Sequence, residues 1–100
     1  LSAITLGEVM ATSDLPAGVV NLLTGPQVEL APWLASHMDV NGIDLTGVRD
    51  ADLAISLEQA AAENLKRVRR SGVEDLFSAP DLDRMTTCLE IKTVWHPMGL

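Results

Sequence analysis

The sequence contains a single cysteine, Cys88, and no long hydrophobic segment. One cysteine cannot form an internal disulfide, and such low usage suits a reducing compartment. No apolar run approaches the roughly 18 residues that a membrane span needs. The first residues lack the basic-then-apolar pattern of a signal peptide, and they also lack an initiator methionine. We therefore expect a cytoplasmic segment cut from a longer chain, with no membrane contact.

Basic residues are scarce, because seven Lys and Arg stand against fourteen Asp and Glu, which gives a net charge of −7. Binding to nucleic acid needs a basic surface, and so does binding to an anionic membrane. The composition therefore argues against both partners. The apolar content of 47% is ordinary for a folded chain, and 100 residues make one domain or part of one.

Metal ligands and an activated nucleophile are also missing. The two histidines, His37 and His96, belong to no i, i+4 pair, and there is no C-x-x-C motif. We expect His37 at the surface near a helix end, His96 in the tail, and no metal site. Cys88 falls on the apolar side of a predicted helix beside Met85 and Leu89. A reactive thiol needs a positive, partly open setting, so we predict that Cys88 is buried and inert.

Two apolar runs, residues 18–25 and 40–47, each end in Thr-Gly. They predict short strands over residues 19–23 and 42–45. The first is apolar on both sides, as in a parallel sheet covered by helices. A strand, a glycine turn and a helix start together form the usual place for a nucleotide phosphate. The simpler interpretation, that strands often end in glycine turns, stays open.

Helical spacing of apolar residues predicts helices over residues 1–13, 27–36 and 51–70, and a last helix that starts at 78–81 and continues to Leu89. Pro32 disfavours the start of the second helix and moves it to near Ala31. The expected buried face of the longest helix consists of Leu53, Leu57, Ala60, Ala61, Leu65 and Val68. The basic cluster, residues 66–70, would offset the dipole at its end. Residues 89–95 alternate as in a strand.

This order predicts an α/β fold, a small Rossmann-like layered structure with a short parallel sheet flanked by helices. A sheet of two or three strands leaves exposed edges. We therefore expect a homo-oligomer, or cover from the remainder of a longer parent chain.

Five stretches carry a more specific signal: EVM at 8–10, DLPAGVVNLLTG at 14–25, LASHMDV at 34–40, IDLTG at 43–47 and AAENLKRV at 61–68. In this order they resemble the aldehyde dehydrogenase superfamily. The resemblance covers residues 6–68 and implies the second half of a Rossmann-like NAD(P)-binding domain. We treat residues 1–100 as one partial domain, with a core over 1–70 and a divergent tail over 71–100.

The resemblance also implies a cofactor-binding set, which consists of Gly25, Thr46, Gly47 and Val48. In the family these positions border the NAD or NADP cleft, and the helix after Gly47 points at the pyrophosphate.

The departures from the family weigh against that role. Val48 stands where the family has serine or asparagine, and Asp52 stands where it has a second glycine. Asp50 and Asp52 place negative charge at the helix start, where they compete with a bound anion. We therefore predict that this segment by itself does not hold the cofactor.

At the positions where the family has its catalytic residues, this sequence has other residues. Ser71 falls where the family carries its general-base glutamate, and Glu74 and Glu90 are out of register. Cys88 comes too early for the nucleophile, and its neighbours lack the family's context. We therefore predict a degenerate, non-catalytic domain with a structural or assembly role. The alternative is the cofactor-cleft portion of an active NAD(P)-dependent aldehyde oxidoreductase. A third possibility is a homodimer that covers its own sheet edges.

Overall fold

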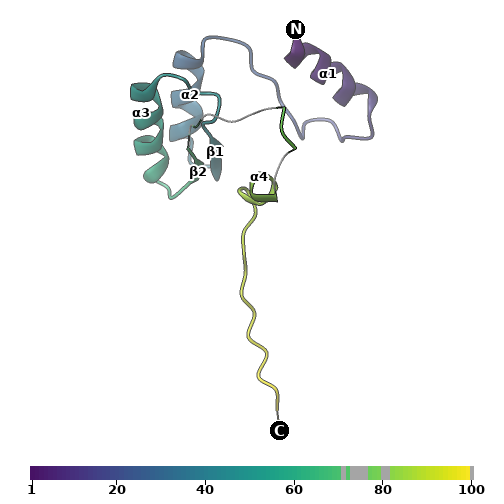
Figure 1. Cartoon of the computed structure of the whole chain (residues 1–100), viewed down its shortest axis with the longest axis vertical. Coiled ribbons are helices and arrows are strands. Elements are labelled where there is room, and N and C mark those ends of the chain that lie inside the picture. Colours follow the sequence, from purple (N-terminus) through teal and green to yellow (C-terminus); the bar gives the residue numbers. More distant parts are fainter. Residues whose placement is uncertain (71, 73–76, 80–81, 100) are drawn as a thin grey trace.

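The computed structural model describes residues 1–70, 72, 77–79 and 82–99 of the 100-residue chain. Helices and strands follow in the order α1 (Ser2–Thr12), α2 (Gln27–Ser36), β1 (Gly42–Asp44), α3 (Ala51–Ala62), β2 (Arg67–Arg69) and α4 (Leu82–Thr86) (Figure 1).

The two strands form a parallel sheet in which Gly42 pairs with Arg67, Ile43 with Val68, and Asp44 with Arg69. Helix α3 makes the crossover that a parallel pair requires. The predicted α/β class with a short parallel sheet is confirmed. Because paired residues share a face, Ile43 and Val68 face one side of the sheet, and Asp44, Arg67 and Arg69 face the other.

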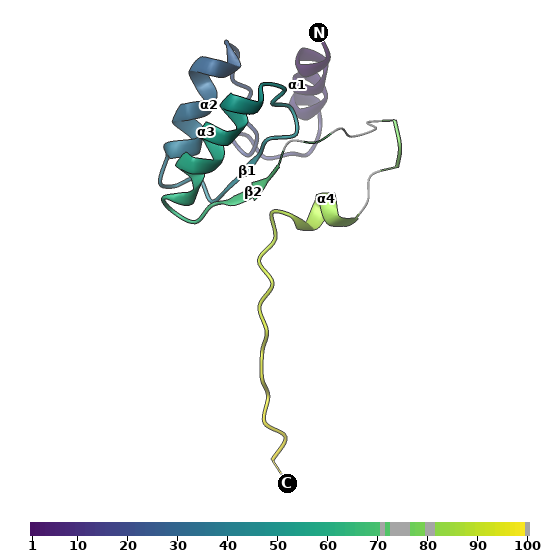
Figure 2. The same cartoon turned by 60° about the vertical axis from the view of Figure 1, so that its left-hand side comes forward.

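The core lies on the apolar side of this sheet, beneath α2 and α3 (Figure 2). Leu45 and Leu57 are its two largest fully buried side chains. The remaining members of the buried cluster are Ala35, Val48 and Ala54. The alanines let the two helices approach closely over the strands, so the core is small.

The predicted strand over residues 19–23 is wrong. These residues form a turn and an irregular stretch, and the large apolar side chains among them are exposed, from 46% for Val20 to 63% for Leu23. A strand needs a hydrogen-bonded neighbour, and in the described residues the sheet contains only β1 and β2, so residues 19–23 pair with neither. Helix α1 lies against this stretch, because a Cβ on Gly7 would be 3.2 Å from Leu22 Cδ1.

The predicted helix over residues 51–70 is too long, because α3 ends at Ala62 and residues 67–69 form β2. The backbone N–H of Leu65 donates to Ala62 O at 3.2 Å, and that of Lys66 donates to Ala61 O at 3.1 Å. This pair of bonds is the Schellman ending of a helix, which requires a left-handed residue. Leu65 supplies it with φ = 57°. The basic cluster therefore does not lie at the end of α3.

Replacing Leu65 with glycine should stabilise the protein by about 0.5–1 kcal/mol. The left-handed conformation strains leucine and not glycine, although glycine gains entropy in the unfolded chain. Leu65 is 89% exposed, so the substitution removes little packing. Urea unfolding would measure the change. Leu65→Ala is the control, because alanine keeps the strain, and an L65G protein no more stable than L65A would contradict this account.

Two further expectations about the helices need correction. Helix α2 starts at Gln27, not near Ala31, and contains Pro32 in its interior. Pro32 is exposed, so its ring faces solvent, and its carbonyl accepts a bond from Ser36 Oγ at 2.9 Å. The expected buried face of the long helix also needs correction. Leu57 and Ala61 are buried in α3 as predicted, but Leu65 lies beyond the helix and is exposed.

The tail after α4 runs away from the rest of the protein without a strand over residues 89–95 (Figures 1 and 2). The radius of gyration is 17.1 Å, compared with about 13 Å for a compact chain of this length. Part of the predicted divergent tail, residues 71, 73–76, 80–81 and 100, lies outside the described residues. Within the described part, no helix has the length and apolar character to cross a bilayer.

Candidate functional site

Three of the four predicted cofactor residues form one turn between β1 and α3. The backbone N–H of Val48 donates to Leu45 O at 2.9 Å and closes this turn at residues 45–48. Gly25 lies elsewhere, immediately before α2, where a Cβ would approach Leu30 Cδ1 to 3.0 Å. The structure thus gives Gly25 a packing role beside Leu30.

Thr46 is hydrogen-bonded to the end of β1. Its backbone N–H donates to Asp44 Oδ1 at 2.9 Å, and its hydroxyl donates to the same oxygen at 2.5 Å. Burial acts to raise the pKa of Asp44, but the two bonds from Thr46 and the charges of Arg69 and Arg84 outweigh it. The pKa is therefore lowered from its ordinary value of 3.8.

Replacing Thr46 with valine should raise the pKa of Asp44, because the hydroxyl bond to the carboxylate is lost. A carboxyl with a lowered folded-state pKa adds stability above pH 3.8, and this stability is lost as the pH falls through the folded-state value. In the variant, the Asp44 carboxylate should therefore add less stability to the folded state, and less stability should be lost as the pH falls. An NMR titration of the Asp44 carboxyl measures the shift. Thr5→Val in α1 is the control and should leave it unchanged.

Val48 is a core residue, with only 6% of its surface exposed. Its side chain packs in the cluster that also contains Leu45 and Leu57. A valine side chain has no hydrogen-bond donor, and this one is buried inside the protein. The position that the family resemblance assigned to the cofactor therefore serves the packing of α3 onto the sheet.

Asp50 occupies the start of α3. Its Oδ1 accepts hydrogen bonds from the backbone N–H groups of Asp52 at 3.0 Å and Leu53 at 3.1 Å. These are the amides that a helix start would offer to a phosphate. Asp52 adds a second acidic side chain in the first turn. The residues present therefore do not fit the pyrophosphate of NAD or NADP.

A buried lysine joins the two loops at the opposite end of the strands. Lys66 is 7% exposed, and its Nζ donates to His37 O at 2.6 Å and to Asn64 Oδ1 at 2.5 Å. The Asn64 side chain in turn donates from Nδ2 to Met38 O at 3.0 Å. Sequence patterns placed Lys66 at the end of its own helix. Lys66 instead places its positive charge beside the carbonyl group at the C-terminal end of α2. The sequence gives no sign of this contact, because it joins residues that are far apart in the chain.

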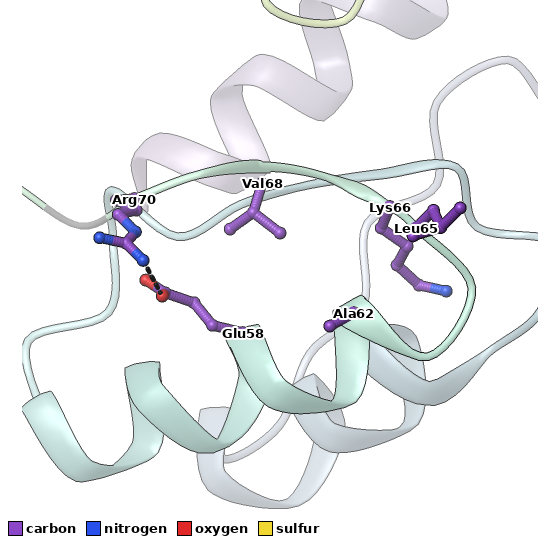
Figure 3. Close-up of a pocket in the computed structure, with 6 residues that line it drawn as sticks. All are labelled: Glu58, Ala62, Leu65, Lys66, Val68 and Arg70. Atoms are coloured by element: carbon purple, nitrogen blue, oxygen red, sulfur yellow. Dashed lines mark ion pairs between the residues drawn. The ribbon is translucent and has the colours of Figure 1, made fainter.

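A surface pocket of about 350 Å³ lies between α3 and β2 (Figure 3). Its apolar part is formed by Ala62 and Val68, with Leu65 at one end. At the other end Arg70 Nη2 and Glu58 Oε2 form an ion pair at 3.0 Å. No sequence motif indicated this pocket, because it depends on the unpredicted strand β2.

The remaining candidate residues are not assembled into a site. Cys88 is exposed, so its predicted burial is wrong. Helix α4 ends at Thr86, and the thiol therefore lies beyond the apolar side of that helix. His37 caps the end of α2 and His96 lies in the exposed tail, as expected. Among the described residues no group of three or more potential ligands could hold a metal ion. Ser71 lies outside the described residues.

Comparison with known sequences decides the family. The model of the aldehyde dehydrogenase family matches residues 1–73. This chain belongs to the aldehyde dehydrogenase family. Aldehyde dehydrogenase family 2 member C4 of Arabidopsis thaliana is 38% identical over 68 residues, which cover 68% of this chain and 13% of that protein. Aldehyde dehydrogenase 1A1 of Gallus gallus is 29% identical over 100 residues, which cover 96% of this chain and 19% of that protein.

The chain therefore spans less than a fifth of the length of these curated relatives. No solved structure gives a significant match. Membership makes this chain a fragment of an aldehyde dehydrogenase family domain. The expectation of family membership is thus confirmed.

Proposed function

We propose that this aldehyde dehydrogenase family segment is a degenerate part of the NAD(P)-binding domain that does not catalyse a reaction by itself and serves structure or assembly. The supporting observation is the cap at the start of α3. The Asp50 carboxylate occupies the backbone donors of Asp52 and Leu53. A cofactor pyrophosphate would have to displace this carboxylate and approach two negative charges.

Titration of NAD and of NADP into the 100-residue chain by calorimetry tests this proposal. We expect no saturable heat up to millimolar cofactor. Saturable binding that is weakened by Gly47→Val, but not by Gly99→Val in the tail, would contradict it. A cap variant tests the cause directly. Asp50→Gly frees the amides with a stability cost of only a few tenths of a kcal/mol. It should therefore bind inorganic pyrophosphate more tightly than the unmodified chain.

The alternative is that the parent protein is an active NAD(P)-dependent aldehyde oxidoreductase and this stretch borders its cofactor cleft. It is supported by family membership and by the position of the turn at residues 46–48, directly after a parallel strand and before a helix. The same titration on a complete parent chain tests it. Absence of cofactor binding there would exclude this alternative.

We further propose that the segment works in a cytoplasmic assembly, with a second copy or with the remainder of a parent chain. The location is supported by the low cysteine content. The assembly is supported by the large apolar side chains that are exposed among the described residues, for example Leu6 in α1 and Trp95 in the tail.

A further inference from the structure

In the part of the chain that the structure describes, no strand pairs with the outer edge of β2. The N–H of Arg67 donates to Asn41 O, and the carbonyl of Arg69 accepts from Leu45 N, so both residues turn their backbone groups toward β1. Backbone groups alternate in direction along a strand, so the N–H and carbonyl of Val68 point away from β1. Such an edge can accept an added strand.

The pocket of Figure 3 adjoins this edge on the helix side of the sheet. Val68 contributes to both features, because its backbone faces the edge and its side chain lies in the pocket beside Ala62. A strand added at this edge would direct every second side chain over the pocket. The pocket offers apolar surface for such side chains, and the Glu58–Arg70 pair at its end can contact an indole N–H and an indole ring.

The tail has the matching pattern. Leu89, Ile91, Thr93 and Trp95 alternate with Glu90, Lys92 and Val94. This segment is extended and unpacked, with Ile91 93% exposed and Trp95 89% exposed. Extended, alternating and apolar on one side, it resembles a strand that lacks a sheet.

In this structure the described part of the tail does not pair with the edge of its own β2. Glu90 Oε1 lies 4.0 Å from Arg67 Nη2, on the charged face of the sheet. Beyond residue 90 the tail continues away from the sheet (Figures 1 and 2).

We propose that residues 89–95 of one chain add as a strand to the outer edge of β2 in a second copy, with Ile91 and Trp95 over the pocket. In a two-fold pair each chain gives its tail and receives its partner's, so the interface closes on itself. This inference deepens the proposed assembly role and rests on it. The cofactor titration does not depend on the tail. A result that contradicts the proposed loss of cofactor binding would therefore not contradict the tail contact, and the reverse also holds.

Two variants of the full chain test the two halves of the contact. Ile91→Pro removes a backbone donor from the tail strand, and Ala62→Gln fills the pocket from the exposed end of α3. Sedimentation velocity over a concentration series should show a dimer for the unmodified chain, and a dissociation constant raised at least about tenfold in each variant. Circular dichroism should be unchanged, because neither position is buried.

Mixing the variants separates a tail-to-edge contact from general adhesion. The Ala62→Gln tail can bind the open edge of the Ile91→Pro chain, so a mixed pair keeps one of its two contacts intact. The mixture should therefore contain more dimer than either variant alone at the same total concentration. Tryptophan emission should shift on dimerisation in Trp33→Phe but not in Trp95→Phe, since Trp33 lies in α2. A monomer at every concentration would overturn the proposal. So would dimers that persist in both variants, or a mixture that stays monomeric.

Discussion

Replacing Leu57 with alanine is expected to lower the free energy of unfolding by about 3 kcal/mol. Leu57 is 1% exposed and lies where α3 meets both the sheet and α2. Its neighbours in the buried cluster include Ala35 and Ala54, which are too short to fill the space that the substitution leaves. A folded domain is typically stable by only about 5–15 kcal/mol, so this loss is a large share of the total.

Ile55→Ala is the matched control, because Ile55 lies on the same helix and is 54% exposed. Its effect should stay within about 0.5 kcal/mol, since alanine also favours the helix. Urea unfolding followed by circular dichroism measures both variants. Equal losses in the two would show that α3 does not pack through the face that contains Leu57.

The sequence predicted the layered α/β class because its helices carry strong local signals. Helix α3 begins with an aspartate cap at Asp50, and helix α2 follows a Gly-Pro turn; their expected spans overlap the observed ones. The strand at residues 42–44 was predicted from its apolar residues and glycine turn. These features are local, so they can be read without knowledge of the tertiary contacts.

The errors arise where partners far apart in sequence decide the structure. Residues 19–23 have a strand pattern but no paired strand in the described chain, whereas residues 67–69, which are mostly basic, form a strand because β1 lies beside them. Leu65 ends α3 in a conformation that leucine disfavours, and no glycine marks the position. Composition indicates neither event, because the strand depends on its pairing with β1 and the left-handed residue that ends α3 is not a glycine.

The candidate site shows the same division. The acidic residues after Gly47 predicted interference with a bound anion, and the hydrogen bonds of Asp50 give that interference a specific geometry. Val48 was noted for lacking a polar group, but its burial shows that the position has a core role. The sequence did not predict the pocket beside β2, because all the residues that line it fall within the expected helix over residues 51–70.

Replacing Lys66 with methionine is expected to lower the free energy of unfolding by about 2 kcal/mol. Methionine preserves the length and the apolar stem of the side chain but removes the ammonium group. The carbonyl of His37 and the Oδ1 of Asn64 then lose the donor that joins the loop after α2 to the loop after α3. These loops lead into β1 and β2. In the variant, the backbone amide hydrogens of the two loops should therefore also exchange faster with solvent.

Lys92→Met is the control, since Lys92 lies exposed in the tail and the same chemical change there should leave stability within about 0.5 kcal/mol. Asn64→Ala isolates the Lys66–His37 bond, because it retains that contact and loses both the Lys66–Asn64 and the Asn64–Met38 contacts. It should be less destabilising than Lys66→Met. Urea unfolding and hydrogen exchange measure the series. If Lys66→Met had no larger effect than Lys92→Met, the buried ammonium would not be what holds the two loops together.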